Sequence, residues 1–448
     1  MPGEATIYAL STPPGKSGVA VVRLAGPLAR RAVERLAPPL PEPRYAGLRT
    51  IKSPDGEVID RALVLCFAGP ATETGEDMAE FHLHGSRAVV AGLLEALGEL
   101  EGFRPAEPGE FARRAFENGK LDLTAVEGLA DLVEAETSAQ RRQALRQLAG
   151  TLGKRCEDWR GRLTEALALV EAGIDFSDVA DVPDAVWRDA APRIAAIADE
   201  MAGQLADGYR GERIREGATI VVAGPPNAGK SSLLNILAKR DVAIVSDIPG
   251  TTRDSIEVRL DLAGLAVTAV DTAGLREARD VIEAEGVRRA EARIAEADLV
   301  LWVVDVTASA AAVPEGQGPA EIWEVRNKVD LVPGAVAGEV GKAGGRRTFR
   351  ISVRTGDGLD TLIDALTSHF RERYEAGETP VITRHRHRHE LVRAEAALRR
   401  ALAGDPMAAP EIVAEDLRDA AGALGRIVGR IDVEDLLDVI FREFCIGK

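Results

Sequence analysis

The stretch Gly224-Pro225-Pro226-Asn227-Ala228-Gly229-Lys230-Ser231 decides the fold of the central part of this chain. It fits the phosphate-binding pattern G-x-x-x-x-G-K-[ST]. A β-branched, apolar run precedes it at 219–223, and apolar residues at helical spacing follow it at 233–237. Glycines let backbone N–H groups close around phosphate oxygens, and the helix N-terminus adds partial positive charge. We therefore expect a nucleotide-phosphate site between this strand and this helix, in preference to a glycine-rich turn without function.

The residues of this loop have distinct expected roles. Lys230 would reach the β- and γ-phosphates and act as a catalytic cation, while the Ser231 hydroxyl would ligate Mg²⁺. The loop is expected to contact the nucleotide through Asn227, Ala228, Gly229, Lys230, Ser231 and Ser232.

Three further motifs follow in the order that a guanine-nucleotide switch requires. Asp271-Thr272-Ala273-Gly274 ends a strand-like run, so Asp271 can hold the magnesium shell and the Gly274 amide can contact a γ-phosphate. Asn327-Lys328-Val329-Asp330 follows another strand-like run, at 321–326. The Asp330 carboxylate can accept both N1–H and the 2-amino group of guanine, which adenine does not offer. Together with the phosphate loop, these motifs predict a GTP site.

The fourth motif departs slightly from the usual sequence. Ser352-Val353-Arg354 stands where small G proteins usually carry Ser-Ala-Lys. The base contact at this position is usually a backbone amide, so we expect Val353 to preserve binding.

Composition limits the class of protein. The chain has 448 residues, enough for about two to four domains. Its 56 Lys and Arg residues against 72 Asp and Glu residues give a net charge of −16, so any RNA contact must come from a local basic patch or a partner. The three cysteines are widely separated and predict neither a disulfide framework nor a zinc site. With no signal-like N-terminus and no long apolar run, we expect a soluble, cytoplasmic protein without membrane association.

Changes along the chain between strand-like runs and helical periodicity predict a multidomain fold. Residues 1–118 have short strand-like runs separated by Gly/Pro turns and indicate an α/β domain, whereas 119–216 have long helical periodicity. Residues 217–372 form the expected Ras-like α/β P-loop G domain, and helical texture resumes in 373–448, clearly from about Glu390. We therefore predict an all-α helical domain into which a G domain is inserted. The Ala/Gly/Pro-rich stretches 307–319 and 333–345 are expected to be surface loops.

This sequence lacks the glutamine that commonly orients the attacking water in GTP hydrolysis. Many small GTPases orient the attacking water with a glutamine directly after D-x-x-G, but here Leu275 stands at that position. An amide oxygen from Asn227 and carbonyls from the segment 246–254 could form an oxygen cage for K⁺, which would supply positive charge at the phosphates. Asn227 could also simply form a turn. Glu283 could orient water, although the residues alone favour a solvated glutamate.

The chain resembles the MnmE (TrmE) family of tRNA-modification GTPases over its whole length. The resemblance rests on the G-x-P-N-x-G-K-S loop, the D-I-x-G-T-T-R-D segment at 247–254, the inserted G domain and the terminal Phe444-Cys445-Ile446-Gly447-Lys448. It implies a homodimer and G domains that dimerise across K⁺. It also implies an N-terminal domain, used for dimerisation, that resembles folate-binding domains and takes a tetrahydrofolate derivative of the 5-formyl or 5,10-methylene type. With an FAD-dependent partner of the MnmG/GidA family, such proteins install an aminomethyl or carboxymethylaminomethyl group on C5 of the tRNA wobble uridine.

The resemblance also assigns individual residues of the G domain. It implies K⁺ ligands at Asn227, Ser246, Ile248 and Thr251, and Mg²⁺ ligands at Ser231 and Thr252. It makes Glu283 the water-orienting, catalytic glutamate. The nucleotide-binding set then extends through Ser246, Asp247, Ile248, Pro249, Gly250, Thr251, Thr252, Asp271, Thr272, Ala273, Gly274, Asn327, Lys328, Asp330, Ser352, Val353 and Arg354.

For the folate site, the resemblance points to Arg23, Glu80, Lys120 and Lys448. The chemistry agrees, because a pterin offers donors to a carboxylate and the glutamate tail offers carboxylates to Arg or Lys. Taken alone, Arg23 and Lys120 would be ordinary solvated charges. One departure is Ser86, where the family usually has a second glycine.

Two features stay open. The run 384–389, Arg-His-Arg-His-Arg-His, could bind a metal, lie near RNA or an acidic partner, or form a solvated hinge after the G domain; its interleaved arginines disfavour a metal and we expect the hinge. Cys445 could be buried or could be a thiolate that takes part in one-carbon transfer, so its role is left unassigned.

Two functions of different classes compete. The first is a GTPase enzyme whose cycle gates tRNA wobble-uridine modification. The second is a GTP-driven binding switch, for example an assembly factor that docks on ribosomal RNA without modifying it. The G domain alone serves both. An assembly factor would normally carry an RNA-binding module such as a KH fold, and none is evident, which favours the first. The set of tRNAs, the carbon unit and any direct tRNA contact lie beyond the sequence.

Overall fold

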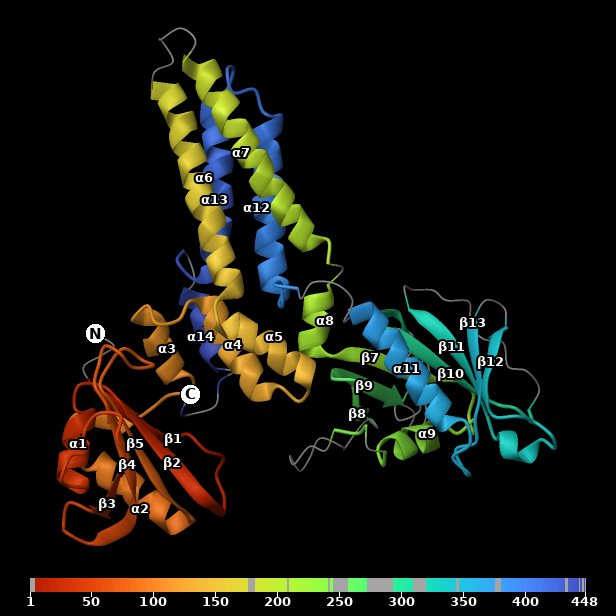
Figure 1. Ribbon diagram of the computed structural model, residues 1–448, viewed down its shortest axis with the longest axis horizontal. Helices are drawn as coiled ribbons and strands as arrows, with labels where there is room; N and C mark the ends of the chain where they lie inside the picture. The colour runs from red at the N-terminus through yellow and green to blue at the C-terminus, as the bar shows by residue number, and fades with distance from the viewer. Residues whose placement is uncertain are drawn as a thin grey trace, which may run out of the picture. The chain divides into compact units, whose positions relative to one another are not determined.

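The computed structural model describes residues 5–175, 182–207, 209–240, 242–244, 257–271, 293–308, 320–343, 346–374, 380–431, 434–442, 444 and 447. The chain divides into two compact units (Figure 1). Unit 1 comprises Met1–Ala130, Gln147–Ala195 and Ala396–Lys448, and unit 2 comprises Asp131–Arg146 and Ala196–Glu395. The chain therefore leaves unit 1 after Ala130 and again after Ala195, and it returns at Gln147 and at Ala396.

Unit 1 begins with a six-stranded sheet in the order β3-β4-β5-β2-β1-β6. Its neighbours pair antiparallel, except that β1 and β6 are parallel. Alternation along β4 buries Ala62, Val64 and Cys66 under α1 and α2, which cover one face. The strands are β1 Thr6–Leu10, β2 Ser17–Ala25, β3 Gly47–Lys52, β4 Val58–Phe67, β5 Met78–Gly85 and β6 Phe103–Pro105, and the helices are α1 Ala29–Leu36, α2 Arg87–Gly98 and α3 Glu110–Glu117.

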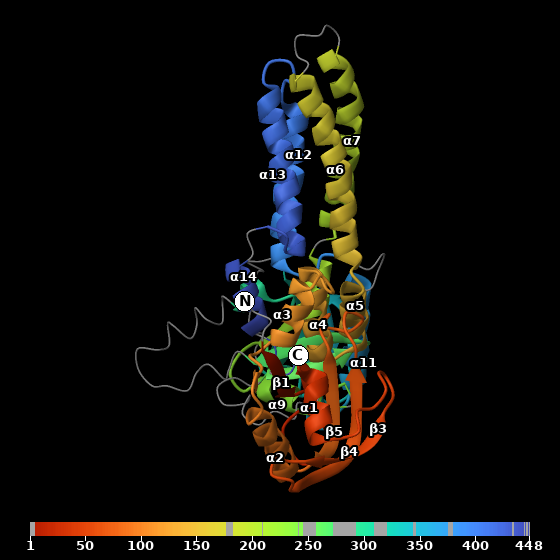
Figure 2. The same ribbon diagram turned by 90° about the vertical axis from the view of Figure 1, so that its left-hand side faces the viewer.

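Long helices complete this unit. Buried residues recur at helical spacing along α6, including Cys156, Trp159 and Leu163, and α6 packs along α13 (Figure 2). The last helix, α14, packs on α3, where Gly109 touches the Phe441 backbone and Arg113 pairs with Asp438. The helices are α4 Leu123–Glu134, α5 Ser138–Leu148, α6 Thr151–Asp175, α7 Val182–Leu205, α12 His385–Ala403, α13 Pro410–Val428 and α14 Glu434–Arg442, of which α4, α5, α7 and α12 each have residues in both units.

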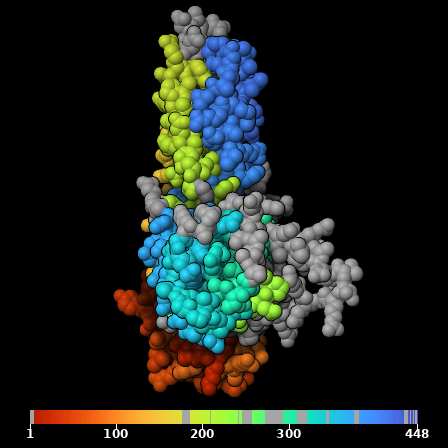
Figure 3. All heavy atoms as spheres, turned by 90° about the vertical axis from the view of Figure 1, so that its right-hand side faces the viewer, coloured from red at the N-terminus to blue at the C-terminus, as the bar shows by residue number. Residues whose placement is uncertain are grey.

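Unit 2 contains a seven-stranded sheet in the order β12-β13-β11-β10-β7-β9-β8. The five inner strands are parallel, and β8 and β12 are antiparallel edge strands; the edge with β12 faces the viewer in Figure 3. The core includes Trp323 stacked on Phe349. The elements are α8 Arg210–Glu216, β7 Ala218–Ala223, α9 Lys230–Leu237, β8 Glu257–Leu262, β9 Leu265–Asp271, β10 Leu299–Asp305, β11 Glu321–Asn327, a 3₁₀ turn at Val329–Leu331, β12 Gly338–Ala343, β13 Arg346–Arg350 and α11 Leu359–Tyr374.

The combination of α/β sheets with long helices is confirmed, and the strands predicted before the phosphate loop, before Asp271 and before Asn327 are all present. The likeness of the N-terminal sheet to folate-binding domains stays a prediction. One expected loop is wrong in part, because residues 338–343 of the stretch 333–345 form β12 against β13. Glycines at 338 and 341 hid this strand, since glycine disfavours strand interiors.

The predicted solvated hinge at 384–389 is also wrong. Helix α12 begins at His385, and His387 and Arg388 are buried. Arg388 forms ion pairs with Glu212 and Asp207, and Arg384 pairs with Asp131. A buried arginine needs such partners, so this basic run serves packing within unit 2.

Candidate nucleotide site and N-terminal site

The phosphate loop owes its shape to two glycines. Gly224 has φ +139°, and a Cβ there would lie 2.1 Å from the Val303 carbonyl oxygen. Gly229 has φ +97°, and a Cβ there would lie 2.2 Å from Asn327 Nδ2. Both positions combine left-handed backbone with close approach, so only glycine fits. The loop thus turns sharply between β7 and α9, and residues of its second half line the cavity described below.

The cationic and metal-binding positions lie at the start of α9. Lys230 Nζ donates to the carbonyls of Gly224 and Pro225 at 3.0 and 2.8 Å. Ser231 Oγ donates to Asp271 Oδ2 at 2.5 Å, and Asp271 is fully buried at the end of β9. A hydroxyl and a carboxylate in contact supply the oxygen donors that Mg²⁺ prefers. The described residues therefore fit a Mg²⁺ site.

The expected guanine end is braced by Asn327, which is buried at the end of β11. Its Nδ2 donates to the Ala228 carbonyl at 2.9 Å, and its Oδ1 accepts from the Val353 amide at 3.0 Å. One side chain therefore ties the phosphate loop to the Ser352-Val353-Arg354 loop. Sequence reasoning expected a nucleotide contact here, and the bracing role emerges only from the fold.

Asp330 carries the charge that guanine would need. Its carboxylate accepts from Ser352 Oγ at 2.6 Å and pairs with Arg354 at 2.6 Å. The Ser352 hydroxyl, and after it the Arg354 guanidinium, holds the pKa of Asp330 below its usual range. The group is thus ionised near neutral pH and offers acceptors only.

Lys328 has a partner that sequence reasoning missed. Its Nζ contacts Asp305 Oδ2 at 2.6 Å, and the hydrogen bonds from Lys328 and Thr307 lower the pKa of Asp305 to about 2. Asp305 ends β10, next to Asn327 at the end of β11. Parallel strands present their carboxyl ends at one edge of the sheet. The position of Asp305 at the end of a predicted strand could therefore have indicated that it lies near Lys328.

These residues converge on one cavity of about 850 Å³. It is lined by Asn227, Gly229, Lys230, Ser231, Ser232, Asn235, Ile236, Asn327, Lys328, Asp330, Leu331, Val353 and Arg354. The phosphate loop and the guanine motifs, about 100 residues apart in the sequence, thus line the same cavity. Asn235 and Ile236 were not foreseen, since they belong to the helical pattern of α9.

Several predicted site residues lie outside the described part of the chain. They are Ser246, Asp247, Ile248, Pro249, Gly250, Thr251, Thr252, Thr272, Ala273, Gly274, Glu283, Cys445 and Lys448. Of the four expected K⁺ ligands, only Asn227 is described. It has φ +61° and lines the cavity.

The N-terminal sheet brings two of its predicted residues into contact. Arg23 on β2 and Glu80 on β5 are direct cross-strand neighbours, with Arg23 Nε 3.5 Å from Glu80 Oε1. Arg23 also pairs with Glu73 at 3.0 Å, and His82 Nε2 lies 3.1 Å from Glu80 Oε2. Glu73 and His82 were not foreseen, and alternation along β5 places His82 on the same face as Glu80.

Lys120 and the C-terminal end approach the same sheet. A Cβ on Gly75 would lie 3.1 Å from Lys120 Cε, and Gly75 is two residues from Glu73, the partner of Arg23. The carbonyl of Gly447 accepts from Ser11 Oγ at 3.1 Å, directly after β1. Residues from four distant parts of unit 1 thus gather around the β1–β2–β5 region.

Comparison with known proteins decides the family. The family model "MnmE helical domain" matches residues 123–445, and the model "GTP-binding protein TrmE N-terminus" matches residues 6–120. A tRNA modification GTPase MnmE from Rhodopseudomonas palustris is 54% identical over 100% of both chains. One from Parvibaculum lavamentivorans is 54% identical over 99% of this chain and 100% of its own. The chain belongs to the MnmE family of tRNA modification GTPases. It is therefore a GTP hydrolase that acts in tRNA modification.

The two family matches together span both units, and they include the nucleotide cavity and the N-terminal sheet. Among solved structures, the G domain of the T. maritima FeoB iron transporter is 22% identical over 34% of this chain and 98% of that one, with a TM-score of 0.24. Within the described residues, no helix has the length and apolar character to cross a membrane.

Proposed function

We propose that this MnmE-family chain is a K⁺-dependent GTPase of tRNA wobble-uridine (U34) modification. In the proposal it adds an aminomethyl or carboxymethylaminomethyl group at C5, together with a flavin-dependent MnmG/GidA-family protein and a one-carbon tetrahydrofolate. It works as a homodimer in the cytoplasm. The observation that carries the nucleotide part is the single cavity on which the phosphate loop and both base-recognition motifs converge.

GTP is bound in this cavity with the phosphates on the loop 224–231. Asp330, ionised and held by Ser352, accepts from the guanine base, and Asn327 keeps the base and phosphate ends at a fixed separation. Lys230 neutralises phosphate charge. Ser231, with Thr252 from the sequence, holds Mg²⁺, and Asp271 orients this shell. Bound Mg²⁺ would neutralise negative charge that develops on the phosphates during hydrolysis.

Hydrolysis in this proposal depends on K⁺ and on Glu283. Leu275 offers no hydrogen bond at the position of the usual glutamine, so another group must orient the water. Asn227 lines the cavity beside the phosphate loop and supplies one oxygen ligand for K⁺, with Ser246, Ile248 and Thr251 as the others. Glu283 orients the attacking water.

The one-carbon chemistry is proposed for the N-terminal sheet. Glu80 would accept from the donors of a pterin, and Arg23, Lys120 and Lys448 would bind carboxylates of the folate tail. The support is the direct pairing of Arg23 with Glu80, together with the position of Gly447 beside Ser11. Cys445 belongs to this end of the chain, with its role left open.

Measurements of two kinds, first of GTP hydrolysis and second of folate binding, test the proposal. Turnover in NaCl should fall by about tenfold or more relative to matched KCl, because K⁺ would supply positive charge that an arginine finger supplies in other GTPases. Equal rates would contradict the K⁺ assignment, and a Glu283→Ala variant with unchanged single-turnover hydrolysis would remove Glu283 from the mechanism.

The second measurement is equilibrium binding of 5-formyltetrahydrofolate to the full chain and to its Arg23→Gln and Glu80→Gln variants. We expect binding by the full chain and about tenfold weaker binding by each variant, because each loses a charge-assisted hydrogen bond. Absence of binding by the full chain would contradict the folate assignment. No observation on the described residues favours the alternative, an RNA-assembly switch without modifying activity.

A further inference from the structure

The β8–β9 hairpin joins the two stretches of sequence that carry the switch motifs. Residues 246–254, expected to bind K⁺ and Mg²⁺, come just before β8, and Thr272–Gly274 come just after β9. At the end of β9, Asp271 accepts from Ser231 of the phosphate loop. Both strands therefore run from the nucleotide cavity to a turn at the opposite end, formed by Ala263 and Gly264.

That turn rests on residues of the helical part of the chain. The Ala139 amide donates to the Gly264 carbonyl at 3.0 Å, and the Ala139 side chain is buried in the same hydrophobic core as the sheet. Glu136 Oε1 accepts from Arg259 Nη1 on β8 at 2.7 Å. We name residues 136–140 the hairpin seat.

The hairpin seat is held by hydrogen bonds within itself and to α8. Gln140 Oε1 accepts from the Thr137 amide at 3.1 Å while Thr137 Oγ1 accepts from the Gln140 amide at 3.4 Å, which is a reciprocal cap at the start of α5. Gln140 Nε2 also donates to the Arg215 carbonyl at the end of α8. The helix that begins in the hairpin seat continues to Leu148, into the residues of unit 1.

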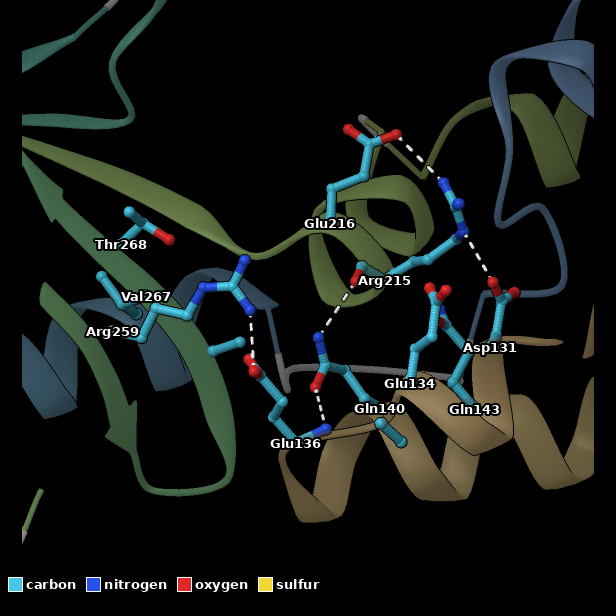
Figure 4. A pocket seen from close by; sticks show the side chains of 12 residues that line it. Asp131, Glu134, Glu136, Gln140, Gln143, Arg215, Glu216, Arg259, Val267 and Thr268 are labelled. Atoms are coloured by element: carbon cyan, nitrogen blue, oxygen red, sulfur yellow. Dashed lines mark hydrogen bonds and ion pairs between the residues drawn. The ribbon is translucent and has the colours of Figure 1, made fainter. Parts of the chain in front are cut away.

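Beside the hairpin seat lies a cavity of about 490 Å³ with polar walls (Figure 4). Its two arginines are already paired, Arg215 with Asp131 and Arg259 with Glu136. Because each arginine already has a carboxylate partner, we assign no ligand to this cavity.

We propose that the hairpin seat transmits the nucleotide state of the GTP site to the helical part of the chain and so couples GTP hydrolysis to tRNA modification. A paired strand resists compression along its length, so a displacement at Asp271 reaches Gly264 and presses on Ser138 and Ala139. Coupling of this kind requires one element that both sites bias, and the hairpin meets both sites. The inference uses only the family's GTPase and tRNA-modification activities, and it needs neither K⁺ nor folate.

Gly264→Ala is the direct test. Gly264 has φ +92°, and a Cβ there would lie 2.5 Å from Ser138 Oγ, so either the Ser138 hydroxyl or the turn must shift. We expect modified nucleosides in cellular tRNA to fall about tenfold, inside the range of typical coupling energies. GTP turnover of the purified variant should stay within about threefold of the parent, because no nucleotide contact is changed.

Two matched variants separate transmission from strain. Gly341 has φ +93° with nothing within 4 Å of its Cβ, so Gly341→Ala imposes the same backbone cost without the contact and should modify tRNA normally. Ser138→Ala removes the hydroxyl that the new methyl meets and leaves the nearest atoms at 3.8 Å. The double variant Ser138→Ala/Gly264→Ala should therefore recover modification to within about twofold of the parent.

If Gly264→Ala does not fold, a double-mutant cycle at Glu136 and Arg259 tests the same inference. Glu136→Lys places like charges beside Arg259 and should lower modification, and Glu136→Lys/Arg259→Glu should restore it. Normal modification in both Gly264→Ala and Glu136→Lys would overturn the inference. A parallel loss of hydrolysis and modification would overturn it too, because the hairpin seat would then only support the GTP site.

Discussion

The nucleotide cavity and the N-terminal sheet are built in opposite ways. The cavity is set by backbone geometry: two positive-φ glycines, and Asn327, which joins two loops through buried hydrogen bonds. The N-terminal site consists of half-exposed ion pairs that bring together Arg23, Glu73 and Glu80. Backbone geometry leaves contiguous motifs in a sequence, whereas ion pairs across strands leave scattered charges. Single substitutions at the residues that shape the cavity should therefore weaken GTP binding. Substitutions in the N-terminal site should lower tRNA modification and leave GTP binding unchanged.

The largest expected effect is on the N-terminal side. Removal of residues 445–448 should abolish tRNA modification while GTP turnover stays within about twofold, since no nucleotide motif lies after Arg354. The measurement is nucleoside analysis of tRNA from complemented cells, beside GTPase rates. Normal modified uridine would make the tail a structural terminus. Loss of GTPase activity would show that the two regions are not separate.

Gly229→Ala should act in the reverse direction. The added methyl would meet Asn327 Nδ2 at 2.2 Å on a left-handed backbone, which disrupts the phosphate loop. GTP affinity should fall about hundredfold, or roughly 2.7 kcal/mol. Titration with a fluorescent GTP analogue measures this, and folate binding by the same variant serves as the control. Near-normal GTP affinity would contradict the bracing of the loop.

Asn327→Ala should lower stability as well as binding. The substitution leaves the Ala228 carbonyl and the Val353 amide without their partner in a buried site, at a cost of about 2–4 kcal/mol. Asn235→Ala, at an exposed residue of the same cavity, is the matched control and should change little. Urea unfolding of the three proteins compares them, and equal midpoints would show that Asn327 does not brace the site.

The smallest effect concerns pH. The pKa of Asp305 is lowered to about 2 by Lys328 and Thr307, so its stabilising contribution is present above the unfolded value of 3.8 and is lost as pH falls from there toward 2. The stability difference between the parent and Asp305→Asn should thus be constant from neutral pH to about pH 5 and should shrink below pH 4. Urea midpoints at several pH values measure it. A difference that stays constant to pH 3 would contradict the Lys328–Asp305 pairing.

The nucleotide cavity could be predicted from the sequence because its motifs are contiguous, whereas the N-terminal ion pairs, which join residues far apart in the sequence, could be predicted only in part. The phosphate loop, its strand and helix, and most of the residues that line the cavity were evident from motif order, whereas Asn235, Ile236 and Leu331 were not. The partners of Arg23 were not, because Glu73 and His82 look like surface residues until the strands are paired. Glycine-containing β12 was hidden for a related reason, since its strand character comes from pairing with β13. The buried Arg388 was hidden as well, because its acidic partners lie about 180 residues earlier.

The most direct test of the account is a change of base specificity at Asp330. An Asp carboxylate accepts two hydrogen bonds from guanine, whereas an Asn amide can donate to the 2-oxo group of xanthine and still accept from Ser352. Competition binding should show that the parent chain prefers GTP over XTP and that Asp330→Asn reverses this preference, each by about tenfold or more. Equal GTP affinity in the parent and in Asp330→Asn would place the guanine base elsewhere and contradict the assignment of the cavity.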